Sequence, residues 1–322
     1  MRHRLVPIAW IATLWVAACG GGGGDAGSPS SDGPFAVGTT AITYVDTSRP
    51  TAAYADVPER DSRTLFTRIY YPAVGAAGGR EVEGAAPATS EGPFPLVMFA
   101  HGFQAVSEVY RDLYVAWAEA GYVVAAPDFP LSSSRSTSNR PVFTDYVHQP
   151  ADLSFLIDRL LEASAGSDGP LAGLIDPERI GASGQSLGGM TTMGFAFHTC
   201  CTDPRIDAAI PMAGRLAGFP DGEYSFAAGP PILVVHGDVD ETVPYADGRA
   251  IYDAASAPRY LLTILGGGHI IPYVAGPTNP QTEPVRRAIV AFFDRYLKGR
   301  PEARERLLAV DDLEVATVES DA

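Results

Sequence analysis

The stretch Gly184-Gln185-Ser186-Leu187-Gly188 reads G-x-S-x-G, and the rest of the chain is interpreted around it. The residues before it favour a short strand at 179–183, and the small and apolar residues at 187–197 favour a buried helix. A serine between a strand and a helix sits on a sharp turn, with its hydroxyl exposed above the sheet. Glycines permit this turn because they carry no Cβ. A glycine-rich turn with an incidental serine matches the same pattern, so Ser186 needs partners elsewhere.

A base must take the proton of this hydroxyl, and histidine suits that role because its pKa lies near neutral pH. The chain has six histidines. His269 follows the last predicted strand, at 260–265, in a loop that begins with three glycines. Such a loop can carry an imidazole over the edge of the sheet. The other five lie in the N-terminal segment, before the serine, or at predicted helix and strand positions. We therefore take His269 as the base.

The base needs an acid that fixes its tautomer and stabilises the imidazolium. Residues 237–244 read G-D-V-D-E-T-V-P and follow a predicted strand at 232–236. We take Asp240, the second acid of this loop, as the partner of His269, and Asp238 as a turn or capping residue. The three candidates then follow the chain order Ser, Asp, His, which is one of the known orders of a catalytic triad.

An oxyanion that forms next to Ser186 needs N–H donors already in place. The backbone N–H of Leu187, directly after the serine, is one candidate. The other should come from the segment His101-Gly102-Phe103-Gln104, which follows a predicted buried strand at 96–100. We choose the N–H of Phe103, with Gln104 as the alternative one position further on.

Predicted strands alternate with predicted helices, which indicates an α/β fold with a mostly parallel sheet and helices on both faces. We expect one catalytic domain at 36–300, an exposed loop at 73–93, no large cap domain after residue 212, and an acidic tail at 301–322. The other predicted strands are 39–45, 65–71, 122–126 and 206–212. The other predicted helices are 107–120, with Ser107 as its N-cap, 145–165 and 283–297.

The N-terminal segment has the features of an export signal. Two arginines precede an apolar run at 5–18, which is too short for a transmembrane helix. The run ends in Val-Ala-Ala-Cys, which resembles a bacterial lipobox and makes Cys19 the candidate for lipidation; an ordinary signal peptide is the alternative. Residues 19–35 are typical of a flexible Gly/Ser/Pro tether. We expect an exported lipoprotein of the cell envelope, in the outer membrane if the host is Gram-negative, or a secreted protein.

The net charge bears on the binding partners, and the cysteine count bears on a possible disulfide. The net charge of −15 disfavours nucleic acid, which is itself polyanionic. We expect a monomer that contacts a membrane only through its lipid anchor. Apart from Cys19, the chain has only Cys200 and Cys201. In an oxidising envelope they could form a vicinal disulfide, or they could remain two buried thiols.

With these residues placed, the chain resembles the α/β-hydrolase superfamily over nearly its whole predicted domain. More narrowly, it resembles bacterial relatives of platelet-activating-factor acetylhydrolase, chlorophyllase, dienelactone hydrolase and cutinase-like polyester hydrolases. The resemblance rests on T-Y-V-D-T-S-R-P-T at 43–51, R-T-L at 63–65, Y-Y-P at 70–72 and G-Q-S-L-G-G-M at 184–190. Gln185 departs from the histidine or tryptophan that is usual at its position.

The resemblance implies hydrolysis of a small or extended carboxylic ester through an acyl-enzyme, without a metal or another cofactor. A lipase or a polyester hydrolase is the close alternative. No tryptophan follows the strand at 206–212, where aromatic-polyester hydrolases often offer one, and this weakens the polyester alternative. A non-catalytic binding lipoprotein on the same fold is the alternative from another class.

Overall fold

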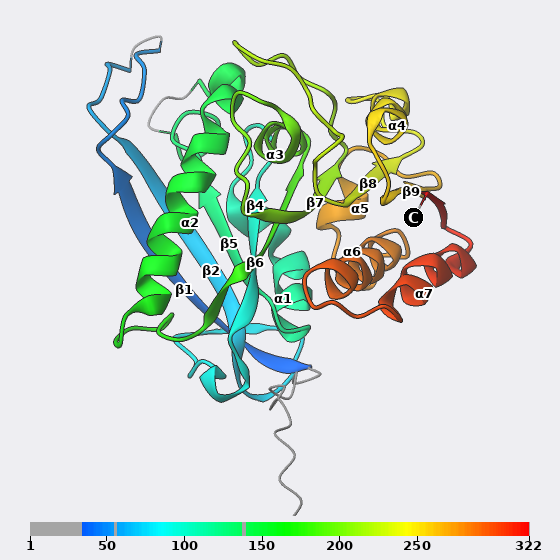
Figure 1. Cartoon of the computed structure of the whole chain (residues 1–322), viewed down its shortest axis with the longest axis horizontal. Helices are drawn as coiled ribbons and strands as arrows, with labels where there is room; N and C mark the ends of the chain where they lie inside the picture. The colour runs from blue at the N-terminus through cyan, green and yellow to red at the C-terminus, as the bar shows by residue number, and fades with distance from the viewer. Residues whose placement is uncertain (1–33, 55–56, 137–139, 322) are drawn as a thin grey trace, which may run out of the picture.

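The computed structural model describes residues 34–54, 57–136 and 140–321. The predicted signal peptide, Cys19 and nearly all of the predicted tether lie outside these ranges. Within them, a ten-stranded sheet runs in the order β10-β9-β8-β7-β6-β4-β5-β2-β1-β3 (Figure 1). Strand β5 therefore lies between β2 and β4, and the chain must cross over the sheet to place it there.

The sheet has a parallel centre and antiparallel neighbours on both sides. The parallel strands are β4 (Phe94–Ala100), β5 (Val123–Asp128), β6 (Ile175–Gln185), β7 (Ile206–Met212), β8 (Ile232–Gly237) and β9 (Arg259–Ile264). The long pair β1 (Phe35–Asp46) and β2 (Arg63–Ala76) runs antiparallel beside β5, and the short β3 (Glu81–Glu83) borders β1. Because parallel strands end at the same edge, the loops that follow β4, β6, β8 and β9 meet there.

Helices cover both faces of this sheet, as predicted. Helices α2 (Gln149–Ala165), α3 (Leu187–Phe197) and α4 (Tyr245–Ala254) pack in one hydrophobic cluster, and α1 (Arg111–Glu119), α6 (Thr282–Tyr296) and α7 (Ala303–Leu308) pack in the other. Alternate residues of β4 enter opposite clusters, so this central strand is buried on both faces. Within the described ranges, none of the helices, including the short α5 (Ile271–Val274), has the length and apolar character needed to cross a membrane.

The start of the predicted helix at 107–120 differs in the structure. Residues Ser107–Tyr110 form a 3₁₀ turn, and α1 begins only at Arg111. Ser107 does not cap a helix with its side chain. Its backbone N–H instead donates to Oδ1 of Asp128 at 2.7 Å, which ties this turn to the end of β5. The predicted loop at 73–93 is also partly ordered, because β2 continues to Ala76 and β3 follows.

The predicted end of the domain at residue 300 is wrong, because the segment after it joins the sheet and the core. Residues 303–308 form α7, and β10 (Ala316–Asp321) pairs antiparallel with β9 along its whole length. The side chains of Leu307, Val310 and Ala316 are buried in the core. The segment looks like a tail in sequence because an edge strand carries charged residues on its open side.

The connection between β7 and β8 has the predicted form. Residues 213–231 contain no helix, and they return to the sheet through turns and a single bridge between His198 and Tyr224. No cap domain is inserted at this position among the described residues. This connection therefore places no helix over the edge of the sheet above β6 and β7.

Candidate active site

Ser186 occupies the sharp turn predicted for it, between the end of β6 and the start of α3. Its backbone has φ 58° and ψ −115°, a strained conformation that L-residues rarely adopt. A Cβ at Gly188 would overlap the carbonyl oxygen of Ala100, and one at Gly184 would overlap that of Gly188. The glycines of the motif are thus required by close backbone approach, and they leave the Ser186 side chain at the carboxyl edge of the sheet.

The structure brings the three predicted residues together. Nε2 of His269 lies 2.8 Å from Oγ of Ser186, and Nδ1 of His269 lies 2.7 Å from Oδ2 of Asp240. The Asp240 carboxylate can only accept, so Nδ1 carries the proton and Nε2 is free to accept the proton of the serine hydroxyl. This arrangement matches the geometry of a nucleophile, a base and an orienting acid.

The carboxylate of Asp240 is fixed from its other side. Its Oδ1 accepts the backbone N–H groups of Thr242 and Val243 at 2.8 and 2.9 Å, and its side chain is fully buried. Both oxygens therefore have partners, and the one that faces His269 is set by the turn of its own loop. Because the carboxylate cannot turn, the hydrogen bond from Nδ1 to Oδ2 holds the imidazole in one tautomer and one orientation.

The predicted capping residue Asp238 connects the acid loop to the histidine loop. Its Oδ1 accepts the backbone N–H of Gly266 at 2.7 Å, and the N–H of Val239 donates to the carbonyl of Gly267 at 3.1 Å. A Cβ at Gly237 would overlap the carbonyl oxygen of Gly267, so the two loops are in direct backbone contact. The path from β9 to His269 is therefore defined by the neighbouring loop rather than by the flexibility of its glycines.

The hydrogen bonds around Phe103 decide between the two candidates for the second oxyanion donor. The N–H of Gly102 donates to the hydroxyl of Tyr110 at 3.0 Å, and the N–H of Gln104 donates to the carbonyl of Ser132 at 2.9 Å. The N–H groups of Phe103 and Leu187 have no acceptor among the described residues. Leu187 is the first residue of α3, where a helix leaves its N–H groups unpaired. Phe103 and Leu187 therefore remain the pair of available donors.

Two further histidines support these loops without contacting the serine. His101 donates from Nδ1 to the carbonyl of Gly102 and accepts the N–H of Phe129 at Nε2, which fixes the start of the oxyanion segment. His236 donates from Nε2 to the carbonyl of Val243, beside Asp240. Burial lowers the pKa of both imidazoles, so they remain neutral scaffolding groups.

Comparisons with known proteins bear on the fold and on part of the sequence. The family model of platelet-activating factor acetylhydrolase, isoform II, matches residues 79–152, which include β4, α1 and β5 but not Ser186. The α/β hydrolase domain-containing protein 17C of human is 31% identical over 107 residues, and that of Xenopus tropicalis is 30% identical over 107. A solved ferulic acid esterase from Streptomyces cinnamoneus superposes with a TM-score of 0.64 and 23% identity. The alignment covers 85% of this chain and 93% of the esterase.

The chain has the α/β-hydrolase fold. The matches to protein 17C cover 30% of this chain and about a third of the relatives' length, 32% of the human and 34% of the Xenopus tropicalis protein. The likeness to the esterase structure concerns the fold.

A stripe of aromatic rings borders the candidate oxyanion hole. The ring of Phe103 contacts that of Phe143, which contacts Tyr146, which contacts Phe219, with centroid separations of 5.5, 6.0 and 5.3 Å. Phe103, Tyr146 and Phe219 also pack against a small cluster that contains Leu187. An apolar surface thus begins at the residues that offer the two backbone donors.

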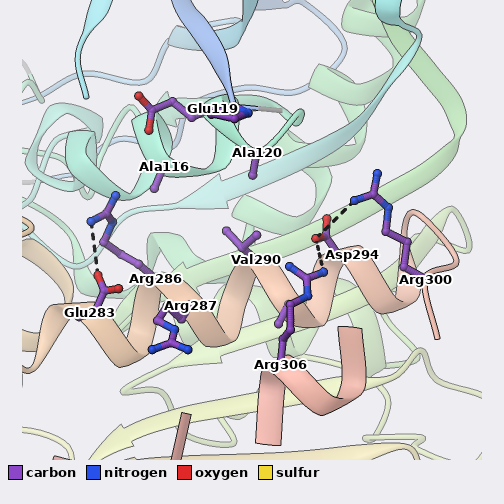
Figure 2. Close-up of a pocket in the computed structure, with 12 residues that line it drawn as sticks. Ala116, Glu119, Ala120, Glu283, Arg286, Arg287, Val290, Asp294, Arg300 and Arg306 are labelled. Atoms are coloured by element: carbon purple, nitrogen blue, oxygen red, sulfur yellow. Dashed lines mark hydrogen bonds and ion pairs between the residues drawn. The ribbon is translucent and has the colours of Figure 1, made fainter. Parts of the chain in front are cut away.

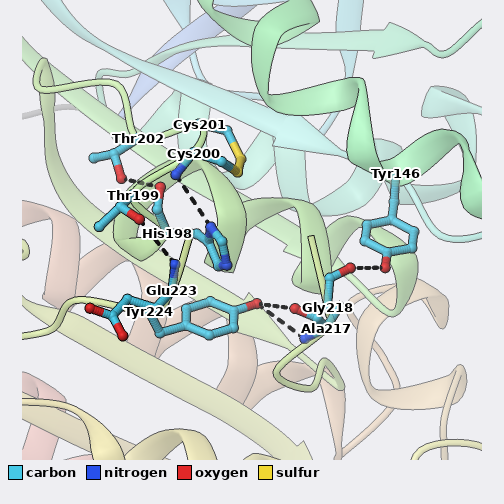
Figure 3. Close-up of a disulfide and its surroundings, with 10 residues drawn as sticks. All are labelled: Tyr146, His198, Thr199, Cys200, Cys201, Thr202, Ala217, Gly218, Glu223 and Tyr224. Atoms are coloured by element: carbon cyan, nitrogen blue, oxygen red, sulfur yellow. Dashed lines mark hydrogen bonds between the residues drawn. A yellow bond between two sulfur atoms is a disulfide. The ribbon is translucent and has the colours of Figure 1, made fainter. Parts of the chain in front are cut away.

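The two cysteines form a vicinal disulfide at the end of α3 (Figure 3). The structure adopts the bridged form of the two alternatives left open by the sequence. His198 accepts the N–H of Cys200 and packs against Phe219. His198 and the two sulfurs form a group with metal-ligand spacing, but the disulfide occupies both sulfurs. The expected absence of a metal stays a prediction.

A cavity of about 470 Å³ lies away from the triad, between α1 and α6 (Figure 2). Its lining includes Glu119 and Ala120, which precede the amino end of β5, whereas Ser186 lies at the carboxyl edge of the sheet. Its lining includes two ion pairs, Arg286 with Glu283 at 3.6 Å and Arg306 with Asp294 at 2.7 Å. This mixed-charge cavity has no part in the site built around the serine.

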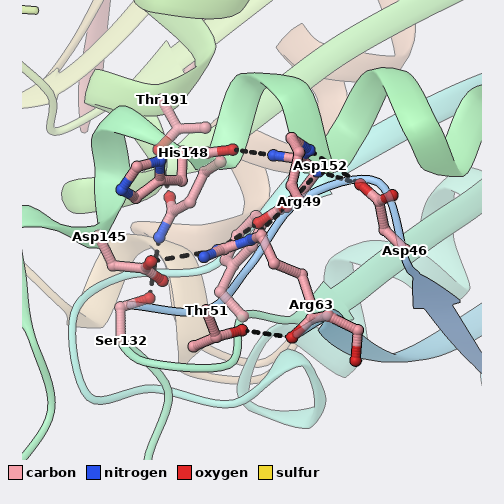
Figure 4. A network of polar contacts seen from close by, with 12 residues as sticks. Asp46, Arg49, Thr51, Arg63, Ser132, Asp145, His148, Asp152 and Thr191 are labelled. Carbon is pink, nitrogen blue, oxygen red and sulfur yellow. Dashed lines mark hydrogen bonds and ion pairs between the residues drawn. The ribbon is translucent and has the colours of Figure 1, made fainter. Parts of the chain in front are cut away.

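A buried polar network lies around Ser132, which contacts the oxyanion segment at 101–104 (Figure 4). Arg63, on β2, makes two hydrogen bonds of 2.6 Å to the carboxylate of Asp152, on α2. Nearby, Gln149 donates to the hydroxyl of Ser132 at 2.8 Å and accepts that of Thr191, on the nucleophile helix. Because Ser132 also accepts the N–H of Gln104, this network joins α2 and α3 to the oxyanion segment.

Proposed function

We propose that the protein hydrolyses carboxylic esters through an acyl-enzyme on Ser186. The observation that carries this proposal is the continuous hydrogen-bonded path from Oγ of Ser186 through His269 to the buried carboxylate of Asp240. A serine hydroxyl becomes nucleophilic when a neighbouring base takes its proton, and this path supplies the base and its orienting acid.

In the first half-reaction, Oγ of Ser186 attacks the ester carbonyl while Nε2 of His269 takes the hydroxyl proton. The carbonyl oxygen becomes an oxyanion, which the N–H groups of Phe103 and Leu187 stabilise. The tetrahedral intermediate then collapses, its bond to the alcohol oxygen breaks, and the imidazolium returns the proton to that oxygen. The alcohol leaves and an ester of Ser186 remains.

In the second half-reaction, water replaces the alcohol. His269 takes a proton from the water as it attacks the acyl carbon, and the same two N–H groups stabilise the second oxyanion. When this intermediate collapses, Oγ of Ser186 recovers the proton from the imidazolium and the carboxylic acid leaves. Asp240 stays ionised throughout and stabilises the imidazolium that forms twice in each cycle.

We propose small or extended esters with an apolar or aromatic group as the substrate class. The connection at 213–231 inserts no cap over the serine, which favours an open approach for the substrate. The stripe of Phe103, Phe143, Tyr146 and Phe219 offers flat apolar contact beside the oxyanion donors. One structural neighbour is a ferulic acid esterase, and ferulate is itself an aromatic acyl group.

A panel of esters tests this function. p-Nitrophenyl acetate, octanoate and palmitate, together with methyl ferulate, are compared with wild-type protein and the Ser186→Ala variant. We expect turnover of acetate or ferulate esters by the wild type and a loss of about 10⁴-fold or more in the variant. Preference for palmitate would favour the lipase alternative, and absence of turnover with every ester would favour a binding protein.

A further inference from the structure

The side chain of Gln185 lies where three distant segments meet. Its Oε1 accepts the hydroxyl of Tyr110 at 2.7 Å, and that hydroxyl oxygen accepts the N–H of Gly102 at 3.0 Å. Its Nε2 donates to the backbone carbonyl of His269 at 2.8 Å. One buried amide thus connects the segment of the oxyanion donor Phe103 to the backbone of the catalytic base.

The chemistry of the partners fixes the direction of this chain of hydrogen bonds. The carbonyl of His269 can only accept, so the amide nitrogen of Gln185 must face it and the amide oxygen must face Tyr110. The Tyr110 hydroxyl donates its single proton to that oxygen and is left to accept the N–H of Gly102. Each of the three hydrogen bonds therefore has one possible direction, and successive bonds of this kind polarise one another.

The packing around this chain leaves little room for a different arrangement. Gln185 and Tyr110 are 1% and 2% exposed. A Cβ at Gly102 would lie 2.7 Å from Oε1 of Gln185 and 3.0 Å from the hydroxyl oxygen of Tyr110. The absence of a side chain at position 102 therefore allows the amide and the hydroxyl to approach the oxyanion segment.

We propose that Gln185 is a positioning residue, which sets the distance between the oxyanion donors and His269 through its two hydrogen bonds. The proposal rests on the proposed ester hydrolysis. A tetrahedral intermediate contacts the oxyanion donors and the base at the same time, so both must be correctly placed. A displacement of about 1 Å in such a site costs roughly 100-fold in rate. Gln185 reaches both segments through hydrogen bonds to the Tyr110 hydroxyl and the His269 carbonyl, and not through the reacting atoms.

The test uses the full chain and the rate at which a fluorophosphonate labels Ser186. This reaction needs the nucleophile, the base and the oxyanion hole, and it does not depend on the choice of ester. Gln185→Met keeps the side-chain volume and removes both hydrogen bonds. We expect its labelling rate to fall about 10- to 100-fold. In ester turnover, kcat should fall with little change in KM, because the ester itself does not touch residue 185.

Gln281→Met is the matched control. Gln281 also donates from Nε2 to a backbone carbonyl of the segment that leads to His269, that of Leu265 at 3.2 Å, but it makes no bond to the oxyanion segment. We expect its labelling rate to stay within about twofold of wild type. An equal loss in both variants would overturn the proposal, since any lost hydrogen bond to this loop would then have the same effect.

Gln185→Glu gives a readout that a packing role would not produce. An ionised carboxylate there accepts the Tyr110 hydroxyl but repels the carbonyl of His269, whereas a protonated one can donate to it. Burial raises the pKa of such a carboxyl. We therefore expect the ratio of variant to wild-type labelling rate to rise as the pH falls from 8 to 5.5. A ratio independent of pH would contradict the proposal.

Tyr110→Phe covers the case in which the Gln185 variants do not fold. It breaks the chain at its other link, so it should slow labelling on its own. Where Gln185→Met folds, adding it to Tyr110→Phe should cost less than it does in the wild type. If Gln185→Met and Tyr110→Phe were each labelled at the wild-type rate, the positioning role would be overturned and the proposed function would stand. Absence of labelling in the wild type would instead overturn the proposed function.

Discussion

Oδ2 of Asp240 lies 2.7 Å from Nδ1 of His269, while Oδ1 of the same carboxylate accepts two backbone N–H groups. An asparagine at this position must keep its oxygen on the side of those two donors. Its NH₂ group then faces Nδ1, and the imidazole is forced to carry its proton on Nε2, where it cannot accept from Ser186.

For Asp240→Asn we therefore expect kcat to fall by about 10³- to 10⁴-fold with a folded protein. Steady-state hydrolysis of p-nitrophenyl acetate and a thermal unfolding scan measure the two quantities. A variant that keeps more than a tenth of the wild-type kcat would show that Asp240 is not the orienting acid.

The elbow glycine at 188 should tolerate no side chain. Gly188→Ala places a methyl group against the carbonyl of Ala100, so we expect a loss of at least about 1–3 kcal/mol in the free energy of unfolding and a marked loss of Ser186 labelling. Gly78→Ala is the control, because no atom lies within 4 Å of the added Cβ. Denaturant titration compares the two variants, and equal stability would contradict the close approach.

Arg63 should contribute to stability rather than to chemistry. Its guanidinium pairs with the buried carboxylates of Asp152 and Asp145. Arg63→Met takes the cation away from Asp145 and leaves Asp152 with Arg49 alone. We expect a loss of about 3–5 kcal/mol in the free energy of unfolding, with little change in KM of the folded fraction. Arg249→Met, which removes an exposed pair with Glu319, should cost at most about 1 kcal/mol. Similar denaturation midpoints for the two variants would refute this.

Stability should decline on mild acidification. Burial lowers the pKa of His101 and His236, so below about pH 6.5 the unfolded chain binds protons that the folded protein does not. Each such histidine then removes up to about 1.4 kcal/mol of unfolding free energy per pH unit, until its folded pKa is reached. Urea unfolding at pH 7.5, 6.5 and 5.5 measures this slope. A flat profile over that range would mean that neither imidazole is kept neutral by the fold.

Much of the fold was predictable because its signals are local. Apolar runs such as 206–212 and small residues such as those at 187–197 specify strands and helices through the residues they contain, and the structure places both elements with those bounds. The candidate triad could also be proposed from sequence, because the order of strands along the chain places Ser186, Asp240 and His269 at one edge of a parallel sheet.

Features that depend on distant partners could not be predicted in this way. Strand β10 reads as an acidic tail until β9 is placed beside it. Gln185 reads as an unusual motif residue, and its role depends on Tyr110, which lies 75 positions earlier in the chain. The sequence led us to choose Phe103 over Gln104 as donor, but the structural reason depends on the distant Ser132, whose carbonyl accepts the N–H of Gln104.

Mass spectrometry of the intact protein after fluorophosphonate treatment tests the central claim most directly. We expect one label per folded wild-type molecule, mapped to Ser186, and none in Ser186→Ala. A folded wild-type protein that takes up no label, or a Ser186→Ala variant that is labelled as fast as the wild type, would contradict the account.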